Sequence, residues 1–350
     1  MKKPDFVGCR EDGTIVLGNH ISCDGKVEEH NKAIVFSHAH EDHVTNNSIA
    51  DAYLKDKKVV MTDDTRKLCS TTMLCNLVSD YNLEILEHGK ELEFDDFSIK
   101  LLEAGHILGS SQILVNDKKY GKLGYSGDIG ENINSFIDAD ILVLDSTYSG
   151  EHTNRKWTME DSMSQLVDDI KQHIDQDDIN IVADPGLLEL ILHELNIWNR
   201  VPVVIGDKKE AGWSQVYKEK HYEQPNGYVL KGTDDERELK FQNKFNITVA
   251  HNRSKLDENP KGITYIAKNF GIENEIPINE VSEKFKLVGL SCHATGKSIL
   301  DYVEKVNPDI VITDSSRTNT ENAEKLAKIV QQEAGIKSIT SGEIELKNFK

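Results

Sequence analysis

The chain has 350 residues, of which 38% are hydrophobic and 29% charged, a composition typical of a folded, water-soluble protein of one or two domains. Its formal net charge of −19 argues against a generally basic surface for binding phosphate backbone, although bound divalent ions and a few lysines can make one cleft locally positive. Five cysteines without a CxxC pair, and no long apolar run, predict a cytoplasmic protein with neither a signal peptide nor a membrane segment.

The first predicted strands are short apolar runs at residues 14–17 and 32–36, with Asp24-Gly25 between them. Two interpretations of Asp24 are open. It is either part of a simple Asp-Gly turn or a carboxylate that orients a metal-binding histidine.

The second of these strands leads into residues 37–44, Ser-His-Ala-His-Glu-Asp-His-Val, where three histidines and an aspartate fall within six positions. Imidazole nitrogens and carboxylate oxygens are ligands for zinc, iron and manganese. His38 and His40 are two residues apart, so in an extended segment they point the same way and can chelate one ion. Asp42 and His43 follow a change of direction and could serve a second ion. The pattern favours a metal centre over a polar surface loop.

Beyond this loop, residues 59–62 are a predicted strand, followed by a helix that Asp63 or Asp64 caps and that extends to Leu77. Further strands are predicted at residues 92–94, 97–102, 113–115, 122–125 and 141–144.

Three of these later strands end in residues suited to a metal centre. His106 lies between glycines after residues 97–102 and is the candidate third imidazole of the first ion. Asp128 lies on a glycine-flanked turn after residues 122–125 and could bridge two ions. Asp145 directly follows residues 141–144. A sheet with ligands at one edge indicates a reaction centre there.

The middle of the chain alternates helix and strand, which predicts a small α/β domain inserted into the first one. Thr158 caps its first helix. From Lys286 the chain is expected to return to the first domain, with a strand at 287–290, a helix at 299–306 and a strand at 309–313.

The motif HxHxDH at 38–43 resembles the signature of the metallo-β-lactamase superfamily. The phrases AGHILGS (104–110), YSGDIG (125–130) and DSTYSGEHTNR (145–155) are similar to those of its β-CASP nucleases, which include the mRNA 3′-end processing endonuclease, ribonuclease J and ligase-associated exonucleases. The resemblance covers about the first 155 and the last 65 residues. It implies an αββα sandwich from residues 1–150 and 285–350, and a short β-CASP-like α/β insert from residues 151–284.

The resemblance also implies roles near the C-terminus. His293 would lie close to the metals, oriented by Asp145, and would protonate the leaving group. The Gly-Lys-Ser that follows is not a phosphate loop, because Ser291 stands where that motif needs glycine. RNA-acting members usually have a histidine after the strand at 309–313 and DNA-acting members a valine. Depending on a one-residue alignment choice, this chain has Asp314 or Ser315 there. Asp314 is either a replacement oxygen ligand or a capping residue beyond the metal's reach.

The sequence therefore predicts a metal-dependent hydrolase, an endo- or exonuclease that cleaves single-stranded nucleic acid with a metal-activated water. RNA, in RNA processing, is favoured over DNA. Two divalent ions are expected, zinc by default or manganese, with His38, His40, Asp42, His43, His106 and Asp128 as ligands and His293 and Asp145 as catalytic residues. The alternatives are a non-catalytic nucleic-acid-binding subunit of a processing complex and a small-molecule hydrolase, a lactonase or thioesterase, of the same superfamily.

Overall fold

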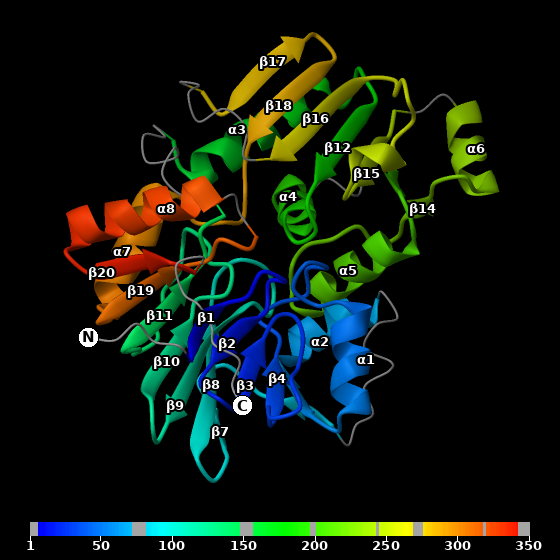
Figure 1. Ribbon diagram of the computed structural model, residues 1–350. Helices are drawn as coiled ribbons and strands as arrows, with labels where there is room; N and C mark the ends of the chain where they lie inside the picture. The colour runs from blue at the N-terminus through cyan, green and yellow to red at the C-terminus, as the bar shows by residue number, and fades with distance from the viewer. Residues whose placement is uncertain are drawn as a thin grey trace. The chain divides into compact units, whose positions relative to one another are not determined.

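The computed structural model describes residues 6–71, 82–147, 157–196, 201–242, 245–268, 276–317 and 320–341. The chain forms two compact units (Figure 1). Unit 1 consists of residues Met1–Thr153 and Cys292–Lys350, and unit 2 of Asn154–Ser291. Three mixed sheets, two in unit 1 and one in unit 2, place the protein in the α/β class that the sequence predicts.

The first sheet of unit 1 has its strands in chain order, antiparallel at its start and parallel from β3 onward. Its strands are β1 (Val7–Cys9), β2 (Ile15–Leu17), β3 (Ile21–Cys23), β4 (Ala33–Val35), β5 (Lys58–Met61) and β6 (Leu83–Ile85). Helix α1 (Asn46–Leu54) follows β4 and contacts β5, and helix α2 (Asp63–Ser70) follows β5.

The cap of α2 differs from the prediction. The hydroxyl of Thr62, one residue before Asp63, accepts the backbone N–H of Thr65 at 3.2 Å. Asp63 and Asp64 lie in the first turn, where a carboxylate is stabilised by the positive end of the helix dipole. The predicted continuation of this helix to Leu77 lies outside the described residues.

The second sheet of unit 1 joins segments from both ends of the chain, in the order β20-β19-β11-β10-β9-β8-β7. Its strands are β7 (Glu91–Glu93), β8 (Phe97–Glu103), β9 (Ser111–Asp117), β10 (Gly121–Tyr125), β11 (Ile141–Leu144), β19 (Ile310–Thr313) and β20 (Lys337–Thr340). Helices α7 (Gly296–Val306) and α8 (Thr320–Ile329), with the π-helical turn η3 (Val330–Ala334), complete unit 1.

Alternation along the strands divides the apolar side chains of unit 1 between two cores. Val143 packs in one core with residues of the first sheet such as Val35, whereas Leu142 packs in another with Ile299 and Val303 of α7. Consecutive side chains on a strand point to opposite faces, so β11 serves both cores. One face of the second sheet therefore packs on the first sheet and the other on α7.

Unit 2 is built on a sheet of order β14-β13-β15-β12-β16-β18-β17, parallel except at β17–β18. Its strands are β12 (Ile179–Ala183), β13 (Val203–Ile205), β14 (Val229–Leu230), β15 (Ile247–Ala250), β16 (Ile263–Lys268), β17 (Ile278–Ser282) and β18 (Phe285–Gly289). Its helices are α3 (Met159–His173), α4 (Leu187–Leu195), α5 (Lys208–Glu219) and α6 (Asp234–Phe241), with the 3₁₀ turn η2 (Arg253–Lys255). The predicted cap at Thr158 is confirmed, since its side chain accepts the N–H of Asp161 at 3.1 Å.

The strand predicted at 287–290 does not belong to the first domain as expected. As β18 it pairs with β16 and β17 of unit 2, and the chain passes into unit 1 between Ser291 and Cys292. The prediction missed the hairpin that β18 forms with β17. Most residues of β17 are exposed, so no apolar alternation marks that strand.

Within the described residues, no helix is both long enough and apolar enough to cross a membrane.

The packing of α7 gives a direct test of the layers in unit 1. Ile299 has no exposed surface, so Ile299→Ala should leave a cavity and lower the free energy of unfolding by about 2–5 kcal/mol. Chemical denaturation followed by circular dichroism measures this loss. Glu304→Ala, on the exposed side of the same helix, is the control and should change stability by less than about 0.5 kcal/mol. Equal effects of the two substitutions would contradict the described packing.

Candidate metal centre

Side chains suited to metal binding gather where strands of unit 1 end. The segment from Ser37 to His43 follows β4, His106 follows β8 and Asp128 follows β10. Strands β8 and β10 are both antiparallel to β9, so they run in the same direction. Their carboxyl ends therefore meet at one edge of the second sheet.

The first candidate group consists of His38, His40, His106 and Asp128, whose ligand atoms lie within 4.8 Å of one another. Nδ1 of His40 lies 3.0 Å from Nε2 of His38 and 3.3 Å from Nε2 of His106. Nitrogen ligands at about 2.0–2.1 Å from a tetrahedral zinc ion are separated by about 3.3–3.4 Å. The residue types and their spacing thus fit a metal ion.

Hydrogen bonding sets the tautomer of His38. The hydroxyl of Ser37 donates to Oδ2 of Asp24 at 2.5 Å, because a carboxylate can only accept. The same hydroxyl oxygen then accepts the proton on Nδ1 of His38, 2.9 Å away. The lone pair of Nε2 is left facing the rest of the group, as metal coordination requires.

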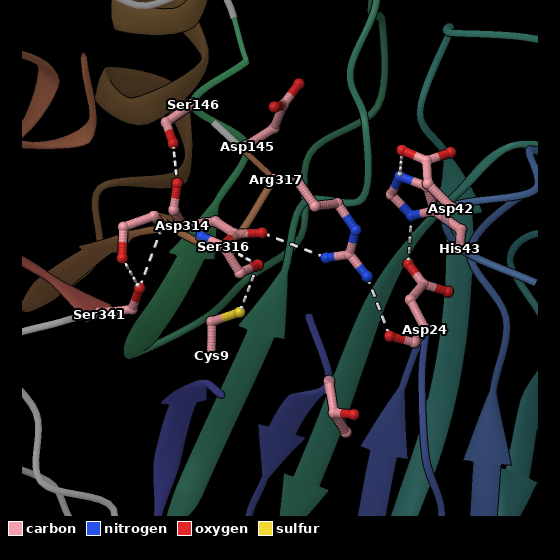
Figure 2. Close-up of polar contacts among 12 residues, drawn as sticks. Cys9, Asp24, Asp42, His43, Asp145, Ser146, Asp314, Ser316, Arg317 and Ser341 are labelled. Atoms are coloured by element: carbon pink, nitrogen blue, oxygen red, sulfur yellow. Dashed lines mark hydrogen bonds and ion pairs between the residues drawn. The ribbon is translucent and has the colours of Figure 1, made fainter. Parts of the chain in front are cut away.

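Asp24 orients His43 in the same way (Figure 2). Nδ1 of His43 donates to Oδ2 of Asp24 at 2.9 Å, while the N–H of Ser37 donates to Oδ1 at 2.8 Å. Nε2 of His43 then faces Oδ2 of Asp128 at 3.3 Å. Asp24 has a φ of 45°, which is typical of a turn. Both interpretations drawn from the sequence therefore apply, because the residue makes a turn and also orients a histidine.

The electrostatics of the group favour a cation. Burial lowers the pKa of His38 and His106 well below the ordinary value, and the neighbouring histidines add to the effect. Burial opposes the charge of Asp128, but His43 and His38 hold the pKa of that carboxyl well below its usual range. Burial also opposes charge on His43, yet Asp128 and Asp24 raise its pKa to about 10. Neutral imidazoles around a buried carboxylate leave room for positive charge, which a metal ion or a proton on His43 can supply.

A second candidate group shares Asp128 with Asp145 and His293. Nε2 of His293 lies 3.8 Å from Oδ2 of Asp128, and Nδ1 lies 3.4 Å from Oδ2 of Asp145. Asp145 is held by its own N–H, which donates to Oγ of Ser126, and by the N–H of Thr147, which donates to Oδ1. Burial opposes protonation of His293, but the hydrogen bond to Asp145 and the charge of Asp128 raise its pKa.

Asp42 lies at the edge of this arrangement and belongs to neither group. Its side chain is 68% exposed, and Oδ2 is 3.6 Å from Nε2 of His43. Its role as a ligand stays a prediction.

Asp314, for which the sequence left two roles open, contacts protein groups through both carboxylate oxygens (Figure 2). Oδ1 accepts the N–H and the hydroxyl of Ser316 at 2.8 and 2.6 Å. Oδ2 lies 3.2 Å from Nη1 of Arg317. Asp314 is absent from both candidate groups, and its contacts match the capping role.

No protein-family model matches the chain. Across 94% of this chain and 79% of the relative, the sequence is 24% identical to RNase aCSPSF2 of Saccharolobus solfataricus. The chain is a distant homologue of this ribonuclease. It is also 27% identical to a probable ribonuclease, MJ4, of Methanocaldococcus jannaschii, over 41% of this chain and 41% of that protein. These similarities confirm the resemblance to β-CASP nucleases that the motifs indicate.

The fold has a full-length counterpart among solved structures. The crystal structure of a protein of unknown function from Enterococcus faecalis matches 97% of this chain and 96% of its own, with a TM-score of 0.60 and 12% sequence identity. At this identity the match shows the fold alone.

Two residues of the site escaped the sequence analysis. Ser37 stands directly before the motif, and a hydroxyl next to a candidate histidine is a usable signal. Arg317 lies far from the motifs in sequence and reaches the backbone carbonyl of Asp24, 293 positions away. No local pattern indicates such a contact.

Asp128 belongs to both candidate groups, so its removal should affect every bound ion. We expect Asp128→Ala to bind little or no metal and to lose activity, whereas the wild type retains divalent metal through purification. Elemental analysis by mass spectrometry measures the metal content per chain. Asp138→Ala is the matched control, because its side chain is 80% exposed and pairs with Lys122. Normal metal content in Asp128→Ala would make Asp128 an ordinary turn residue.

Proposed function

We propose that this protein is a metal-dependent nuclease that cleaves single-stranded RNA. The observation that carries the proposal is the buried group of His38, His40, His106 and Asp128 in a distant homologue of a ribonuclease. A role in RNA processing follows from the same similarity. The described cysteines are buried thiols, which suits action in a reducing cytoplasm.

Unit 1 would be the metallo-β-lactamase domain and unit 2 the inserted β-CASP-like domain. The two packed sheets of unit 1, with α7 on the outer face of the second sheet, support an αββα sandwich. The nearly all-parallel sheet of unit 2 lies between the two segments of unit 1 in the chain, as an insert does.

The centre would hold two divalent ions. His38, His40, His106 and Asp128 would bind one, and Asp42, His43 and Asp128 the other. Zinc suits the nitrogen-rich first set, and manganese is the alternative. When bound, such ions activate a water for attack on phosphorus and neutralise charge that develops on the phosphate oxygens.

The chain's own acid would be His293, which protonates the leaving oxygen. Asp145 accepts from Nδ1 and so keeps the proton to be transferred on Nε2. The N–H of Thr147 donates to Oδ1 of Asp145 and holds the carboxylate, while the backbone N–H of Asp145 donates to Oγ of Ser126 and holds the main chain. Burial opposes the charge of His293, but the hydrogen bond to Asp145 and the charge of Asp128 raise its pKa and so favour the protonated form that a general acid needs.

Cleavage by the metal-loaded protein tests the function directly. End-labelled single-stranded RNA and DNA of the same sequence are incubated with the protein, and the products are separated on a sequencing gel. We expect RNA to be cut, cutting to stop after chelation, and zinc or manganese to restore it. Binding of RNA without cleavage by any metal would favour a non-catalytic subunit. If the protein cleaves neither strand but hydrolyses a lactone or a thioester, the result would favour a small-molecule hydrolase.

His293→Ala separates the acid from the ligands. If His293 protonates the leaving group, turnover should fall by about 10²–10⁴-fold while metal content hardly changes. Asp145→Asn should cause a smaller loss, and the double variant should lose no more than His293→Ala alone, because the two residues act as one unit. His173→Ala, at a partly exposed histidine of α3, is the control. Loss of metal from His293→Ala would instead identify His293 as a ligand, and unchanged turnover would exclude it as the acid.

A further inference from the structure

We propose that Arg317 is a positioning residue of the metal centre, which holds the turn at Asp24 so that Asp24 in turn aims His43 and His38. This inference rests on the metal-binding part of the proposed function and is independent of the substrate. The motifs assign no role to Arg317, which lies in the segment between β19 and α8.

Arg317 bridges the two sheets of unit 1 (Figure 2). Nη2 donates to the backbone carbonyl of Asp24 at 2.9 Å, in the turn after β3 of the first sheet. Nη1 donates to Oδ2 of Asp314 at 3.2 Å, directly after β19 of the second sheet. The side chain is only 11% exposed, so both contacts are shielded from water.

The anchor on the Asp314 side is well held. Oδ1 of Asp314 accepts from the N–H and the hydroxyl of Ser316, its N–H donates to the carbonyl of Leu144 at 3.0 Å, and its own carbonyl accepts from the hydroxyl of Ser146. The guanidinium is therefore attached to the edge of the second sheet and not to a loose loop. Its position relative to Asp24 is set by the packing of the two sheets.

The acceptor on the other side is a strained turn. Asp24 has a φ of 45°, which side-chain-bearing residues rarely adopt, and Gly25 follows at a φ of 147°. A Cβ added to Gly25 would lie 2.4 Å from Oγ1 of Thr14, so Thr14 closes one side of this turn. Arg317 holds the carbonyl of the peptide that joins Asp24 to Gly25. Both contacts keep the side chain of Asp24 pointing at Ser37 and His43.

The position of the Asp24 carboxylate determines the orientation of two imidazoles. Its carboxylate accepts from Nδ1 of His43 and from both donors of Ser37, and Ser37 accepts from Nδ1 of His38. A small rotation of the carboxylate would therefore turn both rings. Loss of partners that orient metal ligands typically costs about 10–100-fold in metal affinity.

The contact needs an arginine in particular. Two parallel donors on one planar group reach two acceptors that belong to different sheets, and the charge stays on at all working pH values. A lysine keeps the charge but carries it on a single nitrogen, which cannot hold both acceptors in the same geometry.

The test compares Arg317→Met and Arg317→Lys with wild type. The dissociation constant for Zn²⁺ is measured by competition with a chromophoric chelator, and the visible spectrum of the Co²⁺-loaded protein reports ligand geometry. We expect zinc binding about 10–100-fold weaker in Arg317→Met, an intermediate loss in Arg317→Lys and an altered cobalt spectrum in both. With RNA, kcat should fall while KM stays near the wild-type value. Arg66→Met is the control, since Arg66 pairs with Asp63 within α2.

Wild-type zinc affinity and an unchanged cobalt spectrum in Arg317→Met would overturn the proposal, even if the metal-free protein melted at a lower temperature. Wild-type zinc affinity in Arg317→Lys would overturn the inference that one planar guanidinium must hold both acceptors.

Should Arg317→Met fail to fold, the zinc affinity of Asp314→Asn is the deciding measurement. This substitution should weaken zinc binding by itself, and combination with Arg317→Lys should add little, whereas unchanged affinity would overturn the proposal. A wild type that binds zinc but cuts no RNA would contradict the proposed function, while the zinc affinities of the variants would still decide the role of Arg317.

Discussion

The buried carboxylate of Asp24 is the constraint on which the centre depends. It has no exposed surface, and burial of a charge is unfavourable unless hydrogen bonds satisfy it. Its oxygens accept from the backbone and hydroxyl of Ser37 and from His43. A shift of the loop after β4 would leave this charge unsatisfied, which costs about 3–5 kcal/mol for a buried ion pair. The loop is therefore held in one conformation before any ligand arrives.

A second constraint is the sign of charge at the centre. Asp128 is buried, and His38 and His106 lose their tendency to take up a proton because burial disfavours the charged imidazole. Among these neighbours, positive charge beside Asp128 comes from a proton on His43, whose pKa is raised, or from a metal ion. A cation bound beside Asp128 would offset the free energy that folding loses by burying these groups. The folded protein is therefore less stable at this position than it would be with apolar residues there.

The sequence predicts most elements correctly where the signal is local. Residues 141–144 coincide with β11 and residues 113–115 lie within β9, because each is a continuous apolar segment. The failures concern pairing across the chain. Strand β17 is exposed and carries no apolar pattern, and without it the sequence offers no reason to place β18 beside β16.

The same contrast between local sequence signals and long-range contacts holds at the candidate site. A dense motif marks His38, His40 and His43, and glycine-flanked turns mark His106 and Asp128, so residue type and position after a strand suffice to find them. The support behind them is invisible in sequence. Arg317 meets Asp24 only because β19 joins the second sheet and that sheet packs on the first, and neither event leaves a local pattern.

The crossing points between the two units have a consequence for how such a protein can diversify. Cys292, where the chain enters unit 1 again, adjoins His293, and Asp145 lies shortly before Thr153, where the chain passes into unit 2. The N–H of Ala294 donates to the carbonyl of Ile129, next to Asp128, and so ties this junction to the centre. A segment of different length or shape in place of unit 2 would leave the histidines after β4 and β8 unchanged. It would, however, alter the chain directly before Cys292 and shortly after Asp145. The proposed metal ligands would thus be insulated from such an exchange, whereas the proposed proton donor would be exposed to it, and the two could evolve at different rates.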